Sequence, residues 1–239
     1  MEPSAFARFL RRRFSRDHPY GLAITLAFLA TVLALWAFLA VVDSVTEQDD
    51  LFRFDAQAHD AVYAFVGPER QPLVWAVTWL GNNTTLIAFV VLAAGALLAA
   101  RKRMLAFRVV LASGVGGLVV LGLKQLFHRA RPLEQVVPAQ GFSLPSGHAF
   151  AATVFYGMMV YLVWRLTDRP WARALAVVVG VILIGAIGLS RVYLNVHFLT
   201  DVVAGWASGT AWLVAVLLVV QVVEHGWTTR RESRAETAG

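Results

Sequence analysis

Long apolar runs, separated by short polar segments, make up most of the chain. Five runs reach the length of about 20 residues that a helix needs to cross the hydrocarbon core of a bilayer. These runs cover residues 21–42, 105–123, 148–166, 172–190 and 200–223. A sixth run, at about 84–100, is slightly shorter and wholly apolar. The pattern predicts an all-α, polytopic integral membrane protein with six transmembrane helices.

Residues 43–83, between the first two predicted spans, are expected to form an outer loop with helical structure of its own. The tripeptide Gly-Asn-Asn at 81–83 interrupts an apolar stretch. Such a polar break predicts that residues 72–80 form a short interfacial or re-entrant piece, and that the following span starts near Thr84.

Apolar residues recur at helical spacing earlier in the same loop, among acidic side chains. They are Leu51, Phe54, Ala58, Val62 and Phe65. This spacing predicts an amphipathic helix that lies on the outer membrane surface. The alternative is a solvated loop that carries a few aromatic residues.

The composition supports a membrane protein. Of the 239 residues, 58% are hydrophobic and 15% are charged, whereas soluble domains are about half apolar and about a quarter charged. The absence of cysteine excludes disulfides and thiolate chemistry. A net charge of +6 is compatible with nucleic-acid binding, but the basic residues lie between apolar spans, which favours membrane lipids and no nucleic-acid partner.

Lysine and arginine are unevenly distributed between the two predicted sides of the membrane. With a cytoplasmic N-terminus, the basic clusters all fall on the cytoplasmic side, at 8–16, 101–108, 165–173 and 230–234. This bias predicts that both termini are cytoplasmic and that the outer loops are 43–83, 124–147 and 191–199. The expected organisation is a cytoplasmic N-terminal segment, one membrane domain and a cytoplasmic tail, at 1–20, 21–223 and 224–239.

The outer loops at 124–147 and 191–199 break this charge bias and carry most of the remaining polar chemistry. Ionisable residues at helix ends near a bilayer are candidates for function. The candidates, together with a neighbouring hydroxyl and glycine, are Lys124, Arg131, Ser146, Gly147, His148, Arg191, His197 and Asp201.

His197 and Asp201 are four residues apart, so on a helix they share one face and the carboxylate can orient the imidazole. An imidazole held by a carboxylate is typical of an activated nucleophile. Gly205 and Gly209 continue the same four-residue spacing, and this pattern of small residues predicts close approach of another helix.

The stretch PSGH at 145–148 has the features of a phosphate cradle at the start of a helix. Pro145 suits the first helical turn, and the residues after it would then lie where free N–H groups favour an anion. Gly147 allows close backbone approach, and His148 is placed to give and take a proton.

Three cations complete this candidate site. Arg131 and Arg191 offer forked donors that suit phosphate oxygens, and Lys124 adds a point charge.

The stretches KQLFHRARP, PSGH and SRVYLNVHFLTD match the patterns K-x6-R-P, P-S-G-H and S-R-x5-H-x3-D without departure, in order and on one predicted face. These patterns are the signature motifs of the type 2 phosphatidic acid phosphatase family, which the chain therefore resembles over roughly residues 51–223. The resemblance implies the helical core that this family shares with vanadium haloperoxidases. Six spans and the charge bias argue against a soluble peroxidase.

The resemblance also implies a role for each candidate. His197 would attack phosphorus and carry a phosphohistidine, with Asp201 orienting it, while His148 would protonate the leaving oxygen and then activate water. The groups expected to hold the phosphoryl oxygens are Lys124, Arg131, Ser146, Gly147 and Arg191. No metal or other cofactor is then required, and the sequence contains no carboxylate cluster suited to Mg²⁺.

The expected function is hydrolysis of the terminal phosphate of a lipid phosphate or diphosphate at the outer face of a bacterial cytoplasmic membrane. Family analogy favours undecaprenyl diphosphate as substrate, with phosphatidylglycerophosphate or phosphatidic acid as alternatives. A lipid phosphotransferase that uses the same intermediate and a non-catalytic transporter or scaffold are competing interpretations. The sequence leaves the oligomeric state open.

Overall fold

The computed structural model describes residues 19–46 and 48–236. Within these ranges the chain is mostly helical and contains no strand, which confirms the all-α prediction for the described part. The helices are α2 (Pro19–Thr46), α3 (Gln48–Val66), the 3-10 helix η1 (Pro68–Arg70), α4 (Gln71–Trp79), α5 (Asn83–Ala99), α6 (Arg103–Phe127), α7 (Gly147–Leu166), α8 (Pro170–Tyr193) and α9 (Leu199–Glu236).

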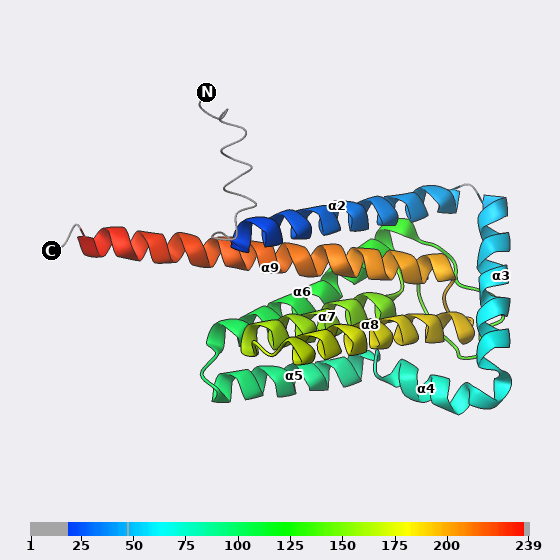
Figure 1. The fold of residues 1–239 in the computed structure, drawn as a ribbon. Helices are drawn as coiled ribbons and strands as arrows, with labels where there is room; N and C mark the ends of the chain where they lie inside the picture. Colours follow the sequence, from blue (N-terminus) through cyan, green and yellow to red (C-terminus); the bar gives the residue numbers. More distant parts are fainter. Residues whose placement is uncertain (1–18, 47, 237–239) are drawn as a thin grey trace, which may run out of the picture.

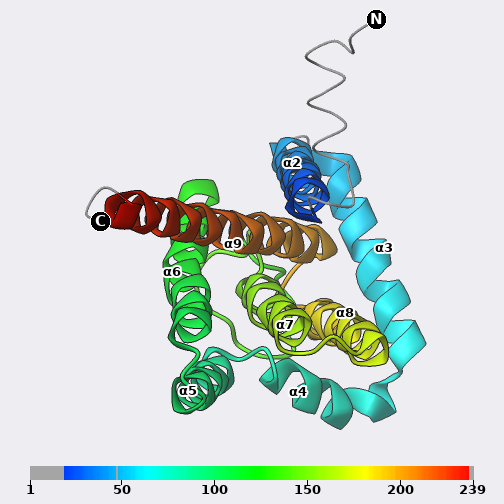
Figure 2. The ribbon, with the colours of Figure 1, turned by 60° about the vertical axis from the view of Figure 1, so that its left-hand side comes forward.

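The long helices form a bundle around α7. Figure 1 shows α5 to α9 running along a common direction, with α2 beside α9 and α3 lying across one end of the bundle. In Figure 2, α7 lies between α6, α8 and α9, and it packs against all three. α7 also carries several of the large, fully buried apolar side chains of the core, among them Phe150, Val154 and Met158.

Small residues allow α9 to approach α7 closely, as the spacing of Gly205 and Gly209 predicts. A Cβ atom on Gly205 would lie 2.7 Å from the carbonyl oxygen of Ser146. A Cβ atom on Gly209 would lie 2.9 Å from that of Phe150. Because Cβ atoms do not approach backbone oxygens so closely, glycine at both positions fixes the spacing between the two helices.

The described helices include four that are long and apolar enough to cross a membrane: α6, α7, α8 and the Leu199–Glu224 part of α9. The segment Pro68–Trp79 and α5 form a fifth candidate if they are one span, bent by 45° at the break between them. In α2 the apolar stretch is shorter, Ala27–Asp43. The chain is therefore an integral membrane protein with four or five candidate spans among the described residues, and the prediction of six spans is not confirmed.

The outer segment contains the two predicted helical pieces. α3 covers the predicted amphipathic stretch, and α4 covers residues 72–80 almost completely. Asn82 is the N-cap of α5, since its side chain accepts a 2.9 Å hydrogen bond from the backbone N–H of Thr84.

The buried stripe of α3 differs from the predicted one. Phe54 and Phe65 are 53% and 86% exposed in the bundle, while Asp55 is buried. The structure confirms a helix over this stretch, but the face of α3 that meets the bundle includes a carboxylate and leaves these two aromatic residues exposed.

Candidate active site

The eight candidate residues lie at helix ends and in the two loops at the end of the bundle that α3 covers (Figure 1). Because consecutive spans run in opposite directions, the end of α6, the start of α7, the end of α8 and the start of α9 all meet there. Lys124 lies in the last turn of α6, and Asp201 lies in the first turn of α9.

His197 and Asp201 form a buried pair just before and inside the first turn of α9. The Nδ1 atom of His197 lies 3.5 Å from Oδ2 of Asp201, and the two side chains are 3% and 0% exposed. The same Oδ2 accepts a 3.0 Å hydrogen bond from the backbone N–H of Phe198. The four-residue spacing thus brings the two side chains together, although α9 begins only at Leu199.

The other ring nitrogen of His197 faces Arg131. Nη1 of Arg131 lies 3.2 Å from Nε2 of His197 and donates to the carbonyl of Val196 at 2.7 Å. An arginine has only donors, so the Nε2 atom that faces it carries the lone pair. Nδ1 then carries the proton, which points towards Asp201.

Burial sets the protonation state of His197. It lowers the pKa of His197 from 6.5 to about 4, with smaller contributions in the same direction from Arg131 and Lys124, while the neighbouring Asp201 opposes this shift. The ring is therefore neutral at neutral pH. A neutral imidazole whose Nε2 is unprotonated is the form that can act as a nucleophile.

The start of α7 is tied to the start of α9. Ser146 is the N-cap of α7: its side chain accepts from the N–H of Ala149 at 3.5 Å, and its own N–H donates to the carbonyl of Asp201 at 2.9 Å. The prediction that Pro145 lies in the first helical turn is wrong, because α7 begins at Gly147 and Pro145 precedes the cap. The helix start still falls at Gly147 and His148.

The remaining cations are held by other parts of the chain. Lys124 donates from Nζ to the carbonyl of Phe142 at 2.6 Å, and its Cε lies 3.8 Å from where a Cβ on Gly147 would stand. Arg191 donates from Nη1 to the hydroxyl of Thr78 at 2.8 Å. The structure thus places a lysine at the start of α7 and anchors an arginine to α4.

Comparison with known proteins assigns the family. The PAP2 superfamily, that of the type 2 phosphatidic acid phosphatases, matches residues 105–224, which is half of the chain. The chain belongs to the PAP2 superfamily. All eight candidate residues lie inside the matched range.

Individual relatives of this PAP2 protein carry phosphatase names. Phosphatidylglycerophosphatase B of Bacillus subtilis is 26% identical over 179 residues, which cover 74% of this chain and 88% of the relative. The undecaprenyl-diphosphatase of Sulfolobus acidocaldarius is 32% identical over 117 residues, covering 45% of this chain and 51% of the relative.

A solved structure has the same fold. The crystal structure of the transmembrane PAP2-type phosphatidylglycerolphosphate phosphatase from Bacillus subtilis superposes with a TM-score of 0.72 and 24% sequence identity. The match covers 82% of this chain and 96% of that one.

Four residues at the site of this PAP2 protein are not among the candidates. Arg129 donates to Asp201 from Nη1 at 2.6 Å and to Asp55 from Nη2 at 2.9 Å, and Thr78 supports Arg191. Gly81, at the break between α4 and α5, lies against His148, since a Cβ there would be 3.3 Å from Cδ2 of that ring.

The sequence contains only weak indications that these four residues belong to the site. A charge on the buried face of α3 could have indicated Asp55. The sequence leaves the role of Arg129 ambiguous because it lies in the variable interior of the first motif. Nothing in the sequence connects Thr78 or Gly81 with residues more than 60 positions away.

The side chains gathered at the site suit an anion better than a metal ion. In the described part of this PAP2 protein, no group of three or more His, Cys, Asp or Glu side chains is arranged to hold a metal ion. The cluster instead combines Lys124, Arg131 and Arg191 with two histidines and one carboxylate, which suits phosphoryl oxygens.

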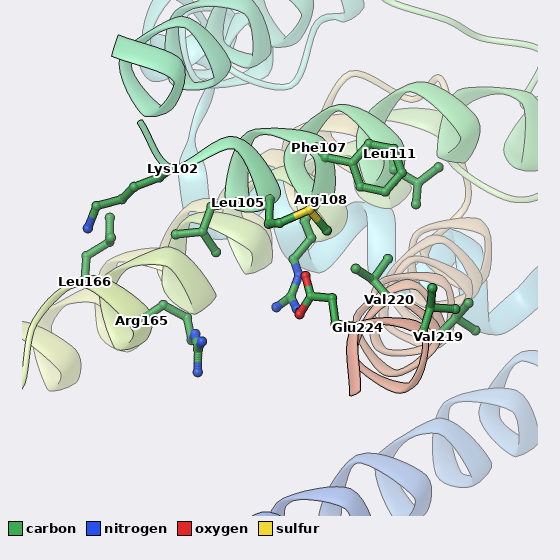
Figure 3. A pocket seen from close by; sticks show the side chains of 12 residues that line it. Lys102, Leu105, Phe107, Arg108, Leu111, Arg165, Leu166, Val219, Val220 and Glu224 are labelled. Carbon is green, nitrogen blue, oxygen red and sulfur yellow. The ribbon is translucent and has the colours of Figure 1, made fainter. Parts of the chain in front are cut away.

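A separate pocket of about 740 Å³ lies away from α3, between the start of α6, the end of α7 and residues 219–224 in the middle of α9. Figure 3 shows Arg108 pointing towards Glu224 among apolar side chains such as Leu105 and Val220. None of the eight candidate residues lines this pocket, so it is distinct from the site described above.

Proposed function

We propose that the chain, a lipid phosphate phosphatase of the PAP2 superfamily, removes the terminal phosphate of a lipid phosphate or diphosphate through a phosphohistidine on His197. The supporting observation is the buried, neutral imidazole of His197, which has Asp201 at Nδ1 and the cationic fork of Arg131 at Nε2. The 3.5 Å separation at Nδ1 is long for a hydrogen bond, as is common in catalytic pairs without substrate.

In the first step, Nε2 of His197 attacks phosphorus and the bond between phosphorus and the lipid oxygen breaks. His148 gives its proton to that leaving oxygen. The phosphoryl group is then bonded to Nε2, and Asp201 stabilises the positive charge of the ring through its Nδ1–H.

In the second step, His148 takes a proton from water as the water oxygen attacks phosphorus. The bond between Nε2 and phosphorus breaks, inorganic phosphate leaves and both histidines return to their starting forms. The cations of Lys124, Arg131 and Arg191, with Ser146 and the backbone N–H of Gly147, hold the phosphoryl oxygens as charge builds up on them.

The favoured substrate in this proposal is undecaprenyl diphosphate, and phosphatidylglycerophosphate and phosphatidic acid are the alternatives. The names of the relatives support the first two of these substrates, since one relative is an undecaprenyl-diphosphatase and another a phosphatidylglycerophosphatase. Phosphate release by purified enzyme from these three lipids, at equal surface concentration, distinguishes the three substrates. Phosphoryl transfer to an added alcohol, with little free phosphate, would indicate a lipid phosphotransferase.

The proposed topology has six spans, with α2 and the broken pair α4–α5 completing the four longer helices. The site then faces the periplasm or cell exterior, and both termini are cytoplasmic, in agreement with the distribution of lysine and arginine. The chain has no cysteine, so a single cysteine at Ala139 should react with an impermeant thiol reagent in intact cells. A cysteine at Asp168, at the other end of the bundle, should react only after lysis. The reverse pattern would refute this orientation.

A phosphoenzyme trap tests the mechanism. Wild-type enzyme mixed with ³²P-labelled substrate and quenched without acid should carry label, because phosphohistidine is acid-labile. His197→Ala should carry none and should not turn over. The control is His128→Asn, which changes an exposed histidine at the same end of the bundle to a residue that tolerates its positive φ. Label on His197→Ala would refute the proposed nucleophile.

A further inference from the structure

Asp55, on the surface helix α3, is 1% exposed, whereas Phe52 and Phe54 on the same helix are half exposed. A buried carboxylate is unfavourable unless it is paired and hydrogen-bonded. Oδ1 of Asp55 accepts from the backbone N–H of Thr200 at 3.0 Å, and Oδ2 accepts from the Thr200 hydroxyl at 2.7 Å. The third donor is Nη2 of Arg129, at 2.9 Å. α3 is therefore joined to the first turn of α9 by directed polar contacts.

Arg129 connects Asp55 to Asp201. Its Nη1 donates to Oδ1 of Asp201 at 2.6 Å and to the Thr200 hydroxyl at 2.8 Å. The guanidinium carbon lies 4.2 Å from the centre of the Phe198 ring. Because the guanidinium is planar and its donors are fixed in direction, one side chain holds two carboxylates at set positions.

Asp201 transmits this constraint to His197. Its Oδ1 is held by Arg129, and its Oδ2 accepts from the N–H of Phe198 and faces Nδ1 of His197. The carboxylate cannot rotate without breaking one of these contacts. Its position decides which way the Nδ1–H of His197 points and therefore where the Nε2 lone pair is directed.

This network is better explained by positioning than by stability. Buried ion networks contribute little net stability compared with apolar packing of the same volume, because their desolvation is unfavourable. What they do provide is a fixed direction for each group. Here the group at the end of the chain of contacts is the carboxylate beside the proposed nucleophile.

We infer that Asp55 and Arg129 are positioning residues for phosphoryl transfer, which hold Asp201 against His197 and make the surface helix α3 part of the catalytic unit. The inference rests on the proposed role of His197. Neither residue belongs to the fixed positions of the three sequence motifs, and Asp55 lies outside the residues that match the family.

The test compares Asp55→Asn and Arg129→Gln with Asp60→Asn, which removes an exposed carboxylate from the same helix. The two network variants should lower kcat by about 10- to 100-fold, by analogy with the loss seen when a partner that orients a metal-binding histidine is removed. KM should stay unchanged, because neither residue belongs to the groups proposed to hold the phosphoryl oxygens. The control should keep wild-type kcat.

The pH profile provides a readout that a loss of packing would not change. Arg129→Gln removes a positive charge near His197, so the pKa of His197 should rise and the acid limb of kcat should move to higher pH. Asp55→Asn removes a negative charge and should move the limb to lower pH. The other charged and titratable groups that face His197 are the same in all variants: Lys124, Arg131, His148, Arg191 and Asp201.

Two further variants complete the test. Arg129→Lys keeps the charge but not the fork, so it should lower kcat without displacing the acid limb. The double variant Asp55→Asn/Arg129→Gln should lose little more activity than the poorer single variant, because both changes break one chain of contacts.

Each result either supports or overturns the inference. Wild-type kcat in Asp55→Asn and Arg129→Gln, or a rise in KM with kcat unchanged, would overturn it. Failure of all network variants to fold, judged by size-exclusion profile and thermal unfolding in detergent, would assign the network to stability and would also overturn it. The phosphoenzyme of the wild-type chain is measured separately, so that a missing phosphohistidine refutes the proposed function and not the positioning network.

Discussion

Arg191, in the last turn of α8, donates a 2.8 Å hydrogen bond from Nη1 to the buried hydroxyl of Thr78 on α4. α4 lies outside the part of the chain that matches the PAP2 superfamily. A proposed phosphate-binding cation is therefore held in place by a helix that carries none of the three motifs.

Loss of this hydrogen bond should weaken substrate binding. Thr78→Val removes the acceptor while keeping the shape of the side chain, so Arg191 loses one of the contacts that direct it. Hydrogen bonds to charged groups contribute about 1.5–3 kcal/mol, and we expect KM to rise by about 10-fold or more. Steady-state kinetics give the split between KM and kcat. Thr78→Ser keeps the hydroxyl and should behave as wild type; equal kinetics for the valine and serine variants would contradict this role.

The glycine contacts between α7 and α9 predict a stability difference between two chemically identical substitutions. Gly205→Ala places a methyl group 2.7 Å from a backbone oxygen, so α9 must move away from α7 and the free energy of unfolding should fall by about 1–3 kcal/mol. Gly117→Ala, on α6, meets nothing within 4 Å and should be neutral or stabilising, because alanine favours the helix. Thermal unfolding in detergent measures both, and similar behaviour of the two variants would refute the close packing.

Much of the site could be predicted from the sequence because the motif residues lie next to the ends of apolar spans. Spans alternate in direction, so knowing their boundaries is enough to bring Lys124, His148, Arg191 and His197 to one end of the bundle. The prediction that these four residues lie close together therefore needed no knowledge of how the helices pack.

The supporting contacts could not be predicted in this way. Asp55 and Thr200 are 145 positions apart, and Thr78 and Arg191 are 113 apart. Each contact depends on how α3 and α4 fold back over the end of the bundle. Helical periodicity identified α3 but not which of its faces meets the bundle. An amphipathic pattern predicts buried aromatic and exposed charged side chains, whereas Phe54 is exposed and Asp55 is buried.

The low pKa of His197 predicts activity at acidic pH. Burial lowers this pKa to about 4, so the ring stays neutral and nucleophilic down to about that pH and loses activity below it. An ordinary histidine, with a pKa of about 6.5, is only about 3% neutral at pH 5. Phosphoenzyme formation from an activated ester, measured by rapid quench between pH 4 and 7 and corrected for ionisation of the substrate, should persist at pH 5. A decline centred near pH 6.5 would show that the ring is not shielded.

Chelation should leave the reaction intact, because the phosphoryl charge is met by Lys124, Arg131 and Arg191. We expect full phosphate release in EDTA and inhibition by vanadate, which mimics five-coordinate phosphorus. Phosphate release is assayed on the purified enzyme with and without chelator. Activity that is lost in EDTA and restored by Mg²⁺ would contradict a cation-based site.

The roles of the two histidines can be separated by the leaving group. If His148 protonates the leaving oxygen, His148→Ala should slow phosphatidic acid most, because a lipid alkoxide leaves poorly without a proton. A lipid phosphate leaving from a diphosphate, or a nitrophenolate, needs much less help. General acid catalysis is typically worth about 10²–10⁴-fold, so single-turnover rates on the two kinds of substrate should diverge by a measurable factor.

Because His148 also activates water in the second step, His148→Ala should accumulate labelled phosphoenzyme from the easier substrate, whereas His197→Ala should form none from either. An equal loss of rate by His148→Ala on all leaving groups would exclude it as the acid.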